Sequence, residues 1–432
     1  MIRLNILLLG FLALFLIRSG TQLFLSRLNI SYLRRHGVTA PEVFQDVVDG
    51  EKLRKVSAYN VDSEHVHMIA TLVSQGLFLL ILLSGVLPWL VKIVNQWMGE
   101  MIIGGLVFFA ILSISTNLIH IPFSLYDTFV IENRYGFNTM TVKMWISDLF
   151  KNIVISAILG GLILWLLLNF VAHGGNAWWV WAWMVTGGFE ILMLWLFPVV
   201  IAPLFNKFEP IENAALEHRI RALMEKMGLQ VKGVFQMDAS KRSKHTNAYF
   251  TGMGRYKRIV LFDTLLTSHT EEEVLAVLAH EIGHWKKKHL LKEIILIEIL
   301  SLVVFYFVSK CLDWRLLYQT FGFQESTAYI GLFLAGVLIG PLGFFAYPFE
   351  STIFRRFERE ADDFVLDLMK TAEPMCSTLK RLAADNLANL TPHPLYAWFY
   401  YSHPPLVERI SRLKGFKAPN PNCKVDSEDQ IW

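Results

Sequence analysis

The sequence is poor in charge and in cysteine. Only 18% of its 432 residues are Asp, Glu, Lys or Arg, against about 25% in a typical soluble protein, and 54% are hydrophobic. A net charge of +3 is too small for a nucleic-acid-binding surface, and three scattered cysteines without a C-x-x-C pair exclude a disulfide framework. With a mean hydropathy of +0.41, this composition favours a protein embedded in a lipid bilayer.

Seven long apolar stretches are each able to cross a bilayer as a helix. About 20 residues at 1.5 Å per residue cover about 30 Å of hydrocarbon. The first stretch contains Arg18 and is not followed by a small-residue cleavage site, so we expect it to be retained rather than removed as a signal peptide. The predicted spans are residues 5–25, 68–91, 101–121, 153–172, 178–204, 291–312 and 328–347.

Basic residues gather in alternate connections between these spans. The connections after spans one, three, five and seven are rich in Lys and Arg, whereas the opposite set holds Arg3, Lys92, Lys310 and Arg315. Because basic residues favour the cytoplasmic side, the amino terminus is expected outside and the carboxyl terminus in the cytoplasm. Two long polar regions, about 205–289 and 348–416, then both lie on the cytoplasmic side.

The most informative residues are His280, Glu281 and His284, which form the pattern HExxH. On a helix, residues four apart share a face, so both imidazoles can reach one ion with Glu281 beside it. Thr270 and Glu273 fit a capping box that starts this helix. Two neutral nitrogen ligands and a carboxylate that can take a proton from water are what zinc-dependent hydrolysis requires. The pattern therefore predicts a zinc hydrolase site.

A catalytic zinc ion also needs a third protein ligand, and the acidic helix after the last span offers candidates. Glu358 and Asp362 are four residues apart and share a face, so one can bind the metal while the other accepts a hydrogen bond from a ligating imidazole. Spacing alone does not choose Glu358 over Glu360. Acidic residues beside arginines on a helix are also more often a salt-bridged, solvated face.

Six stretches of the sequence are highly specific when taken together. They are TFVIENRYGFN (128–138), PLFNKFEP (203–210), SKRSKHTNAYFTG (240–252), LAHEIGHWKKKH (278–289), FEREAD (357–362) and HPLYAWFYYSHPPLVERI (393–410). In this order they resemble the CAAX prenyl protease 1 family of membrane zinc endopeptidases. That family trims prenylated carboxyl-terminal motifs and processes a lipidated yeast mating pheromone. The resemblance covers most of the chain and implies one zinc ion (Zn2+) and a peptide or lipidated-peptide substrate.

The resemblance also implies roles for residues outside the HExxH pattern. Glu358 would be the third zinc ligand, and Asp362 would stand behind the metal site. His403 and Arg409 would orient the substrate or stabilise the oxyanion that forms on the scissile carbonyl. The segment Asn247, Ala248 and Tyr249 resembles an edge strand that pairs with the substrate backbone.

We therefore expect an all-α multi-pass membrane protein with seven transmembrane helices and a cytoplasmic α+β zinc protease domain of the gluzincin, thermolysin-like type. A helix near 212–227 and strands near 231–236 and 258–262 precede HExxH, whose helix is expected to continue directly into span six. The expected regions are transmembrane helices 1–5 with their loops (1–204), a first protease segment (205–290), transmembrane helices 6–7 (291–349), a second protease segment (350–416) and a disordered tail (417–432).

Two other functions stay open at this point: a quality-control protease for membrane proteins, and a transporter or chaperone-like channel with a vestigial metal site. The final residues, DSEDQIW, lack the basic retrieval signal of an endoplasmic-reticulum resident, which favours a bacterial inner membrane. Bacteria are not expected to prenylate proteins, so the natural substrate is left open. The lipid bilayer is the expected partner besides the substrate, and the sequence does not indicate an oligomeric state.

Overall fold

The computed structural model describes residues 2–251 and 256–415, so the tail expected to be disordered, 417–432, lies outside the described residues. Six helices are long and apolar enough to cross a membrane, and a bent helix pair passes the same test when its two helices are taken together, which gives seven crossings if the pair is one span. The pair is α14 (Ala328–Phe344) and α15 (Tyr347–Met369), with a bend of 54°. The six are α1 (Ile6–His36), α2 (Gly50–Leu83), α4 (Met101–Tyr126), α6 (Val142–His173), α7 (Trp178–Leu196) and α12 (His289–Leu312). The predicted multi-pass helical fold is thereby confirmed.

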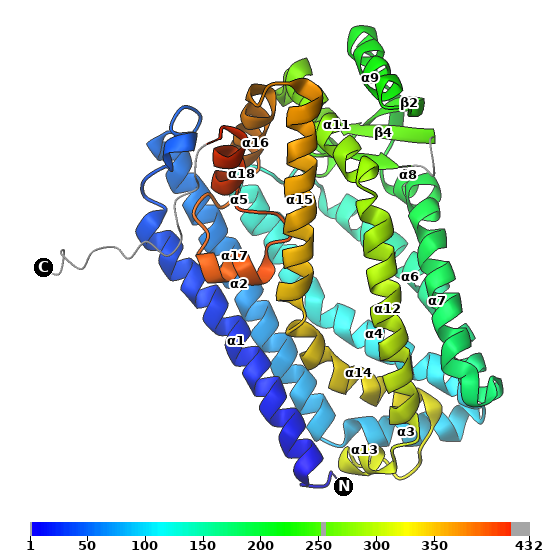
Figure 1. Cartoon of the computed structure of the whole chain (residues 1–432). Helices are drawn as coiled ribbons and strands as arrows, with labels where there is room; N and C mark the ends of the chain where they lie inside the picture. The colour runs from blue at the N-terminus through cyan, green and yellow to red at the C-terminus, as the bar shows by residue number, and fades with distance from the viewer. Residues whose placement is uncertain (1, 252–255, 416–432) are drawn as a thin grey trace, which may run out of the picture.

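The two ends of the helical bundle differ in what they carry (Figure 1). The amino terminus, α3 (Val86–Met98) and α13 (Arg315–Thr320) lie at one end, and a small sheet with α11 (Glu271–Lys286) lies at the other. Shorter elements extend or join the spans: η1 (Glu42–Phe44), η2 (Asp127–Glu132), α5 (Asn133–Tyr135), η3 (Gly175–Ala177), η4 (Phe197–Ile201) and α8 (Ala202–Phe205). A further short helix, η5 (Ala239–Lys241), follows the second strand of the sheet.

The predicted bounds of the second span, 68–91, are wrong. Helix α2 ends at Leu83, Gly85 has a φ angle of 83°, and α3 begins at Val86. A left-handed φ angle is accessible to glycine at little cost, which makes Gly85 a suitable place for the chain to leave one helix and enter another in a new direction. The apolar pattern continues across this turn, so hydrophobicity alone does not reveal it.

The sheet has four strands in the order β1-β2-β4-β3, with β2 parallel to β4 and the other pairs antiparallel. The strands are β1 (Phe208–Pro210), β2 (Gln230–Met237), β3 (Ala248–Thr251) and β4 (Tyr256–Phe262). Helix α9 (Ala214–Lys226), α10 (Asp263–Ser268) and α11 share one apolar cluster with β2, β3 and β4. The predicted helix and both predicted strands are confirmed, and α11 is fixed against the sheet.

The second polar region also folds onto α11. Its helices are α15, α16 (Glu373–Asp385), α17 (Pro394–Tyr400) and α18 (Leu406–Leu413). Ala276 of α11, Val365 of α15 and Ile410 of α18 belong to one buried cluster, which also contains Phe44 of η1 and Val56 of α2. Polar segments that are far apart in sequence therefore share a core at the sheet-bearing end of the bundle.

The HExxH helix does not continue into the sixth crossing, contrary to expectation. Helix α11 ends at Lys286, Lys288 has a φ angle of 56°, and α12 begins at His289. In one continuous helix His289 would be rotated by about 140° from His284, at about 100° per residue. The break instead brings the two imidazoles together, with 3.1 Å between their Nδ1 atoms.

Candidate metal centre

Helix α11 begins as the sequence predicts. The Thr270 side chain accepts a hydrogen bond from the Glu273 backbone N–H, and the Glu273 carboxylate accepts one from the Thr270 N–H, so the capping box is complete. The following turns bury Val274, Leu278 and Ile282 in the core shared with the sheet. The start and the rotation of α11 are thus both fixed.

Gly283, inside the HExxH pattern, is where α11 passes closest to α15. A Cβ atom at this position would lie 3.0 Å from the Cα of Ala361 and 3.1 Å from its carbonyl oxygen. Those contacts are with backbone, which cannot rotate away as a side chain does. The absence of a Cβ at Gly283 therefore lets α15 approach, and Glu358, about one turn before Ala361, comes to lie opposite the two histidines.

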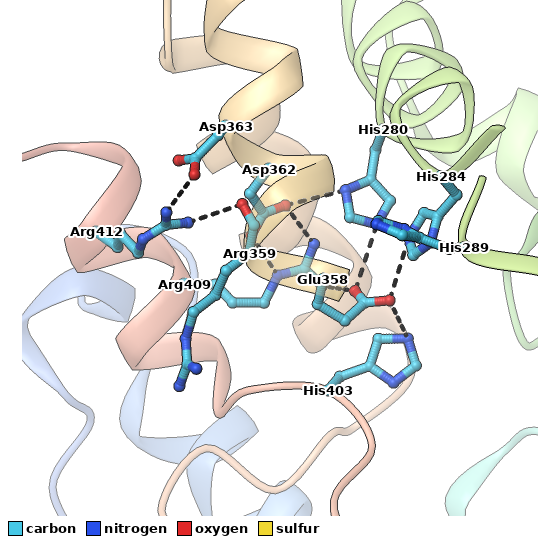
Figure 2. A network of polar contacts seen from close by, with 10 residues as sticks. All are labelled: His280, His284, His289, Glu358, Arg359, Asp362, Asp363, His403, Arg409 and Arg412. Atoms are coloured by element: carbon cyan, nitrogen blue, oxygen red, sulfur yellow. Dashed lines mark hydrogen bonds and ion pairs between the residues drawn. The ribbon is translucent and has the colours of Figure 1, made fainter. Parts of the chain in front are cut away.

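Three side chains meet at this crossing: His280, His284 and Glu358 (Figure 2). The two Nε2 atoms are 3.1 Å apart. His280 Nε2 lies 3.3 Å from Glu358 Oε2, and His284 Nε2 lies 3.2 Å from Glu358 Oε1. Glu360, which spacing could not exclude, points elsewhere and contacts His289, so the geometry selects Glu358 as the third member of the group.

The donor set fits a zinc ion. In a tetrahedron with metal–ligand distances of about 2.0–2.1 Å, two ligand atoms are about 3.3 Å apart, close to the three separations seen here. Glu358 Oε2 is buried and accepts no hydrogen bond from any described residue. Two imidazole nitrogens that face each other and an unsatisfied carboxylate oxygen are groups that a shared cation would satisfy together.

Asp362 and Arg409 support His280 from behind. Asp362 Oδ1 lies 3.0 Å from His280 Nδ1, and Arg409 donates two hydrogen bonds to the Asp362 carboxylate, at 2.9 and 2.7 Å. Burial alone would disfavour the charged imidazole, but the neighbouring carboxylates of Asp362 and Glu358 outweigh it and raise the pKa of His280 to about 9. Arg409 Nη1 also lies 3.6 Å from Glu358 Oε2.

His289 and Glu360 support His284 in a similar way, and the sequence did not suggest this pair. His289 is 1% exposed, its Nδ1 faces His284 Nδ1, and its Nε2 lies 3.2 Å from Glu360 Oε2. Its ring also stacks on Phe357 with 4.3 Å between centroids. A lone pair on His284 Nε2 requires the proton on Nδ1, which His284 can then donate to His289. The helix break at Lys288 is what makes this chain of contacts possible.

Glu281 and His403 are more exposed than the ligand residues His280 and Glu358. The Glu281 carboxyl is half-buried, and burial raises its pKa. The side chain of His403 is 62% exposed, with Nε2 3.3 Å from Glu358 Oε1, on the side of Glu358 away from the other histidines (Figure 2).

The segment that carries His403 is held by Arg355, another residue that sequence reasoning missed. Arg355 Nη1 donates to the carbonyl oxygens of Ala397, Trp398 and Tyr401, at 3.4, 3.1 and 2.7 Å. These carbonyls belong to the end of α17, where the last backbone acceptors lack partners within the helix. The Ala397 carbonyl also accepts from the Tyr401 N–H. One buried guanidinium thus ties the loop before His403 to α15.

The expected edge strand is present, although Asn247 precedes it. Ala248 and Tyr249 belong to β3, which pairs with β4 on one side, and no other strand in 2–251 or 256–415 pairs with its opposite side. Asn247 lies next to the strand: its carbonyl accepts from the Phe262 N–H, and its side chain accepts from the Ala248 N–H. The structure therefore leaves one edge of β3 available for backbone pairing.

Fold and site together define an integral membrane metallopeptidase of the HExxH type, and comparisons with known proteins agree. Residues 29–207 match the family model for the CAAX prenyl protease N-terminal region, five membrane helices, and residues 210–417 match that for peptidase family M48. The structure of Ste24p from S. mikatae superposes with a TM-score of 0.88 at 30% identity, covering 93% of this chain and 97% of that one.

Named relatives are also similar to this chain in sequence. The CAAX prenyl protease 1 homolog of Arabidopsis thaliana is 35% identical over 385 residues, which is 87% of this chain and 91% of the relative. CAAX prenyl protease 1 of Saccharomyces cerevisiae is 35% identical over 350 residues, covering 77% and 76%. The chain therefore belongs to the CAAX prenyl protease 1 family and is a membrane zinc metalloprotease.

The replacement Gly283→Ala is expected to weaken metal binding at least tenfold, because the new methyl group must push Ala361 and hence Glu358 away from the histidines. Zinc retention during competition with a chelator measures this. Gly336→Ala in α14 is the matched control, since no atom lies within 4 Å of its Cβ position, and it should retain zinc as the unaltered chain does. Unchanged zinc affinity in Gly283→Ala would show that the helix spacing does not set the ligand group.

The replacement His289→Phe is expected to lower zinc affinity about 10–100-fold, because it removes the partner of His284 Nδ1 while an aromatic ring remains to stack on Phe357. The control Phe357→Leu removes the stacking and keeps both hydrogen bonds, so its zinc affinity should change much less. Equal losses in the two variants would mean that His289 acts through packing alone. The measurement is the zinc dissociation constant of each purified full-length chain.

Proposed function

We propose that this protease cleaves peptide bonds near the carboxyl terminus of prenylated proteins, as the names of its relatives suggest. The observation that carries the proposal is the position of the ligand group relative to the spans. His284 contacts His289, which is the first residue of the membrane-crossing helix α12. The metal site is therefore close to the membrane. The backbone of a peptide whose lipid stays in the bilayer has only a short distance to span to reach the metal.

In this proposal each chain holds one zinc ion, bound by His280, His284 and Glu358. When bound, zinc supplies Lewis-acid chemistry: it polarises the scissile carbonyl and makes a neighbouring water easier to deprotonate. Asp362 holds His280 with its Nε2 lone pair toward the ion, and His289 does the same for His284. In the described residues, these three ligands form the one group with suitable donor spacing.

The remaining side chains of the site transfer the proton or hold the substrate. Glu281 takes the proton from the attacking water and passes it to the leaving amine, and a pKa raised by burial suits a group that must do both. His403, exposed beside Glu358, is placed to donate a hydrogen bond to the carbonyl oxygen of the substrate. Arg409 is mostly engaged by Asp362, so we assign it the positioning of Asp362 and Glu358.

The free edge of β3 is the proposed site of substrate pairing. Backbone hydrogen bonds to Asn247, Ala248 and Tyr249 would hold an extended peptide without strict selection of its side chains. We also propose the division of the protease into two segments, 205–290 and 350–416, separated in sequence by residues 291–349 and preceded by the five-helix region 1–204. Both segments contribute metal ligands, so neither is complete without the other.

We propose that the metal-bearing end faces the cytoplasm and that the amino terminus lies outside. In support, the sheet and α11 lie at the end of the bundle opposite the amino terminus (Figure 1), and the connections rich in Lys and Arg lead to that end. Surface labelling of single introduced cysteines in intact cells would test the orientation.

The replacement Glu281→Gln is expected to reduce cleavage about 10²–10⁴-fold while zinc content stays unchanged, because the amide keeps the volume of the carboxylate but cannot accept the proton. Glu272→Gln, on the exposed first turn of the same helix, is the control and should cleave within about twofold of the unaltered chain. A zinc-loaded Glu281→Gln protein that cleaves at the unaltered rate would contradict the assignment.

A farnesylated peptide is expected to be cleaved with a kcat/KM at least tenfold above that of the same peptide without the lipid, mainly through a lower KM. The physical reason is that the bilayer concentrates the lipidated peptide next to a metal group at its surface. Full-length protein in lipid nanodiscs and mass spectrometry of the products provide the measurement. Equal cleavage of both peptides would favour a quality-control protease for membrane proteins instead.

A further inference from the structure

A basic cavity lies between α1 and α2, away from the metal ligands. Its volume is about 390 Å³. It is lined by Arg27, Ile30, Arg34 and Arg35 of α1 and by His65 and Met68 of α2. The three arginines and Ile30 lie within about two turns of α1, so this stretch of the helix presents several cationic groups to one concave surface.

The positive charge of this cavity is not neutralised by the protein. Arg27, Arg34 and Arg35 form no ion pair or side-chain hydrogen bond with any residue in 2–251 or 256–415. No carboxylate of the described residues lines the cavity, and Glu64, the neighbour of His65, accepts a hydrogen bond from Tyr396 of α17 instead. A concave site with three unpaired guanidinium groups attracts an anion.

The helix dipole explains the positions of only some of these arginines. Arg34 and Arg35 lie in the last turn of α1, where positive side chains offset the negative end of the helix dipole. Arg27 lies about two turns earlier, beyond the range of that effect. The helix dipole therefore does not explain why Arg27 lines the same cavity as Arg34 and Arg35, and the preference of basic residues for the cytoplasmic side does not require them to share one concave surface.

The depth of the cavity matches the headgroup layer of the bilayer. Leu25 of α1 packs in one cluster with Phe344, the last residue of α14, and with Phe399 of α17. The seventh crossing bends at this level, and Leu395 and Trp398 of α17 expose 41% and 51% of their surface there. An amphipathic helix with exposed Trp is typical of a membrane interface. Arg27 follows Leu25 by about 3 Å along the helix axis.

We propose that this cavity binds the phosphate headgroup of an anionic membrane lipid. The guanidinium groups of Arg27, Arg34 and Arg35 would donate paired hydrogen bonds to the phosphate oxygens. Ile30 and Met68 provide apolar surface for the portion of the lipid next to its headgroup. Basic pockets between membrane helices at the cytoplasmic surface bind lipids in this manner. Free inorganic phosphate shares the anionic chemistry but lacks the apolar portion.

The test is native mass spectrometry of the full-length chain in a neutral detergent, with titrations of phosphatidylglycerol and phosphatidylcholine. In the triple variant Arg27→Gln, Arg34→Gln, Arg35→Gln, affinity for phosphatidylglycerol should fall about 100-fold, because each basic side chain near the membrane contributes about fivefold. Phosphatidylcholine binding should be weak in every variant. The corresponding triple Arg→Lys variant should lie between, since it keeps the charge but loses the paired hydrogen bonds.

The matched control is Lys92→Gln, Lys310→Gln, Arg315→Gln, which removes the same charge from α3, the last turn of α12 and α13. Asn5, at the start of α1, contacts Thr320 of α13, and Arg27 lies about 33 Å further along α1, more than two Debye lengths of about 8 Å, so lipid affinity should change less than twofold. Equal losses in the two Gln variants would overturn the proposal in favour of general electrostatic attraction. Displacement of phosphatidylglycerol by an equal concentration of inorganic phosphate would overturn the lipid assignment. Zinc content and peptide cleavage report whether each variant is folded.

Discussion

The close approach of α11 and α15 is the constraint on which the metal centre depends. Gly283 lets the backbone of α15 pass within contact distance, and that approach alone brings Glu358 to the two histidines of α11. Neither helix can form the ligand group by itself. Apolar residues around the crossing pack α11 against the sheet on one side and against α15 and α16 on the other. Because this packing sets the approach of the two helices, the site depends on these residues as directly as on the ligands.

Charge compensation explains why so many ionisable groups are buried at one place. Glu358, Asp362 and Arg409 have side chains that are 8%, 2% and 8% exposed, and isolated charges at such depth are costly. Asp362 and Arg409 neutralise each other, and Asp362 orients His280. This leaves the two histidines and Glu358, whose Oε2 has no hydrogen-bond partner among the described residues. A divalent cation completes this set of ligands. The buried pair of Asp362 and Arg409 thus holds His280 in place behind the site.

Much of the site could be predicted from the sequence, because local patterns fix it. The capping box, the HExxH spacing and the apolar spans depend on residues within a few turns of one another. Spacing alone limited the third ligand to the acidic residues of one helix. The family resemblance implied Glu358, and the rotation of α15 against α11 places Glu358 rather than Glu360 opposite the two histidines. His289 was missed because the break at Lys288 has no glycine or proline to mark it. Arg355 was missed because its partners are backbone carbonyls of another segment, which no side-chain pattern reveals.

The most direct test of the account is to locate the metal in the full-length, zinc-loaded protein. An anomalous difference map recorded at the zinc absorption edge is predicted to show one strong peak about 2.0–2.2 Å from His280 Nε2, His284 Nε2 and a carboxylate oxygen of Glu358. A strong peak at other residues, or zinc bound by the two histidines with Glu358 turned away, would contradict the claim that the crossing of α11 and α15 builds the metal centre.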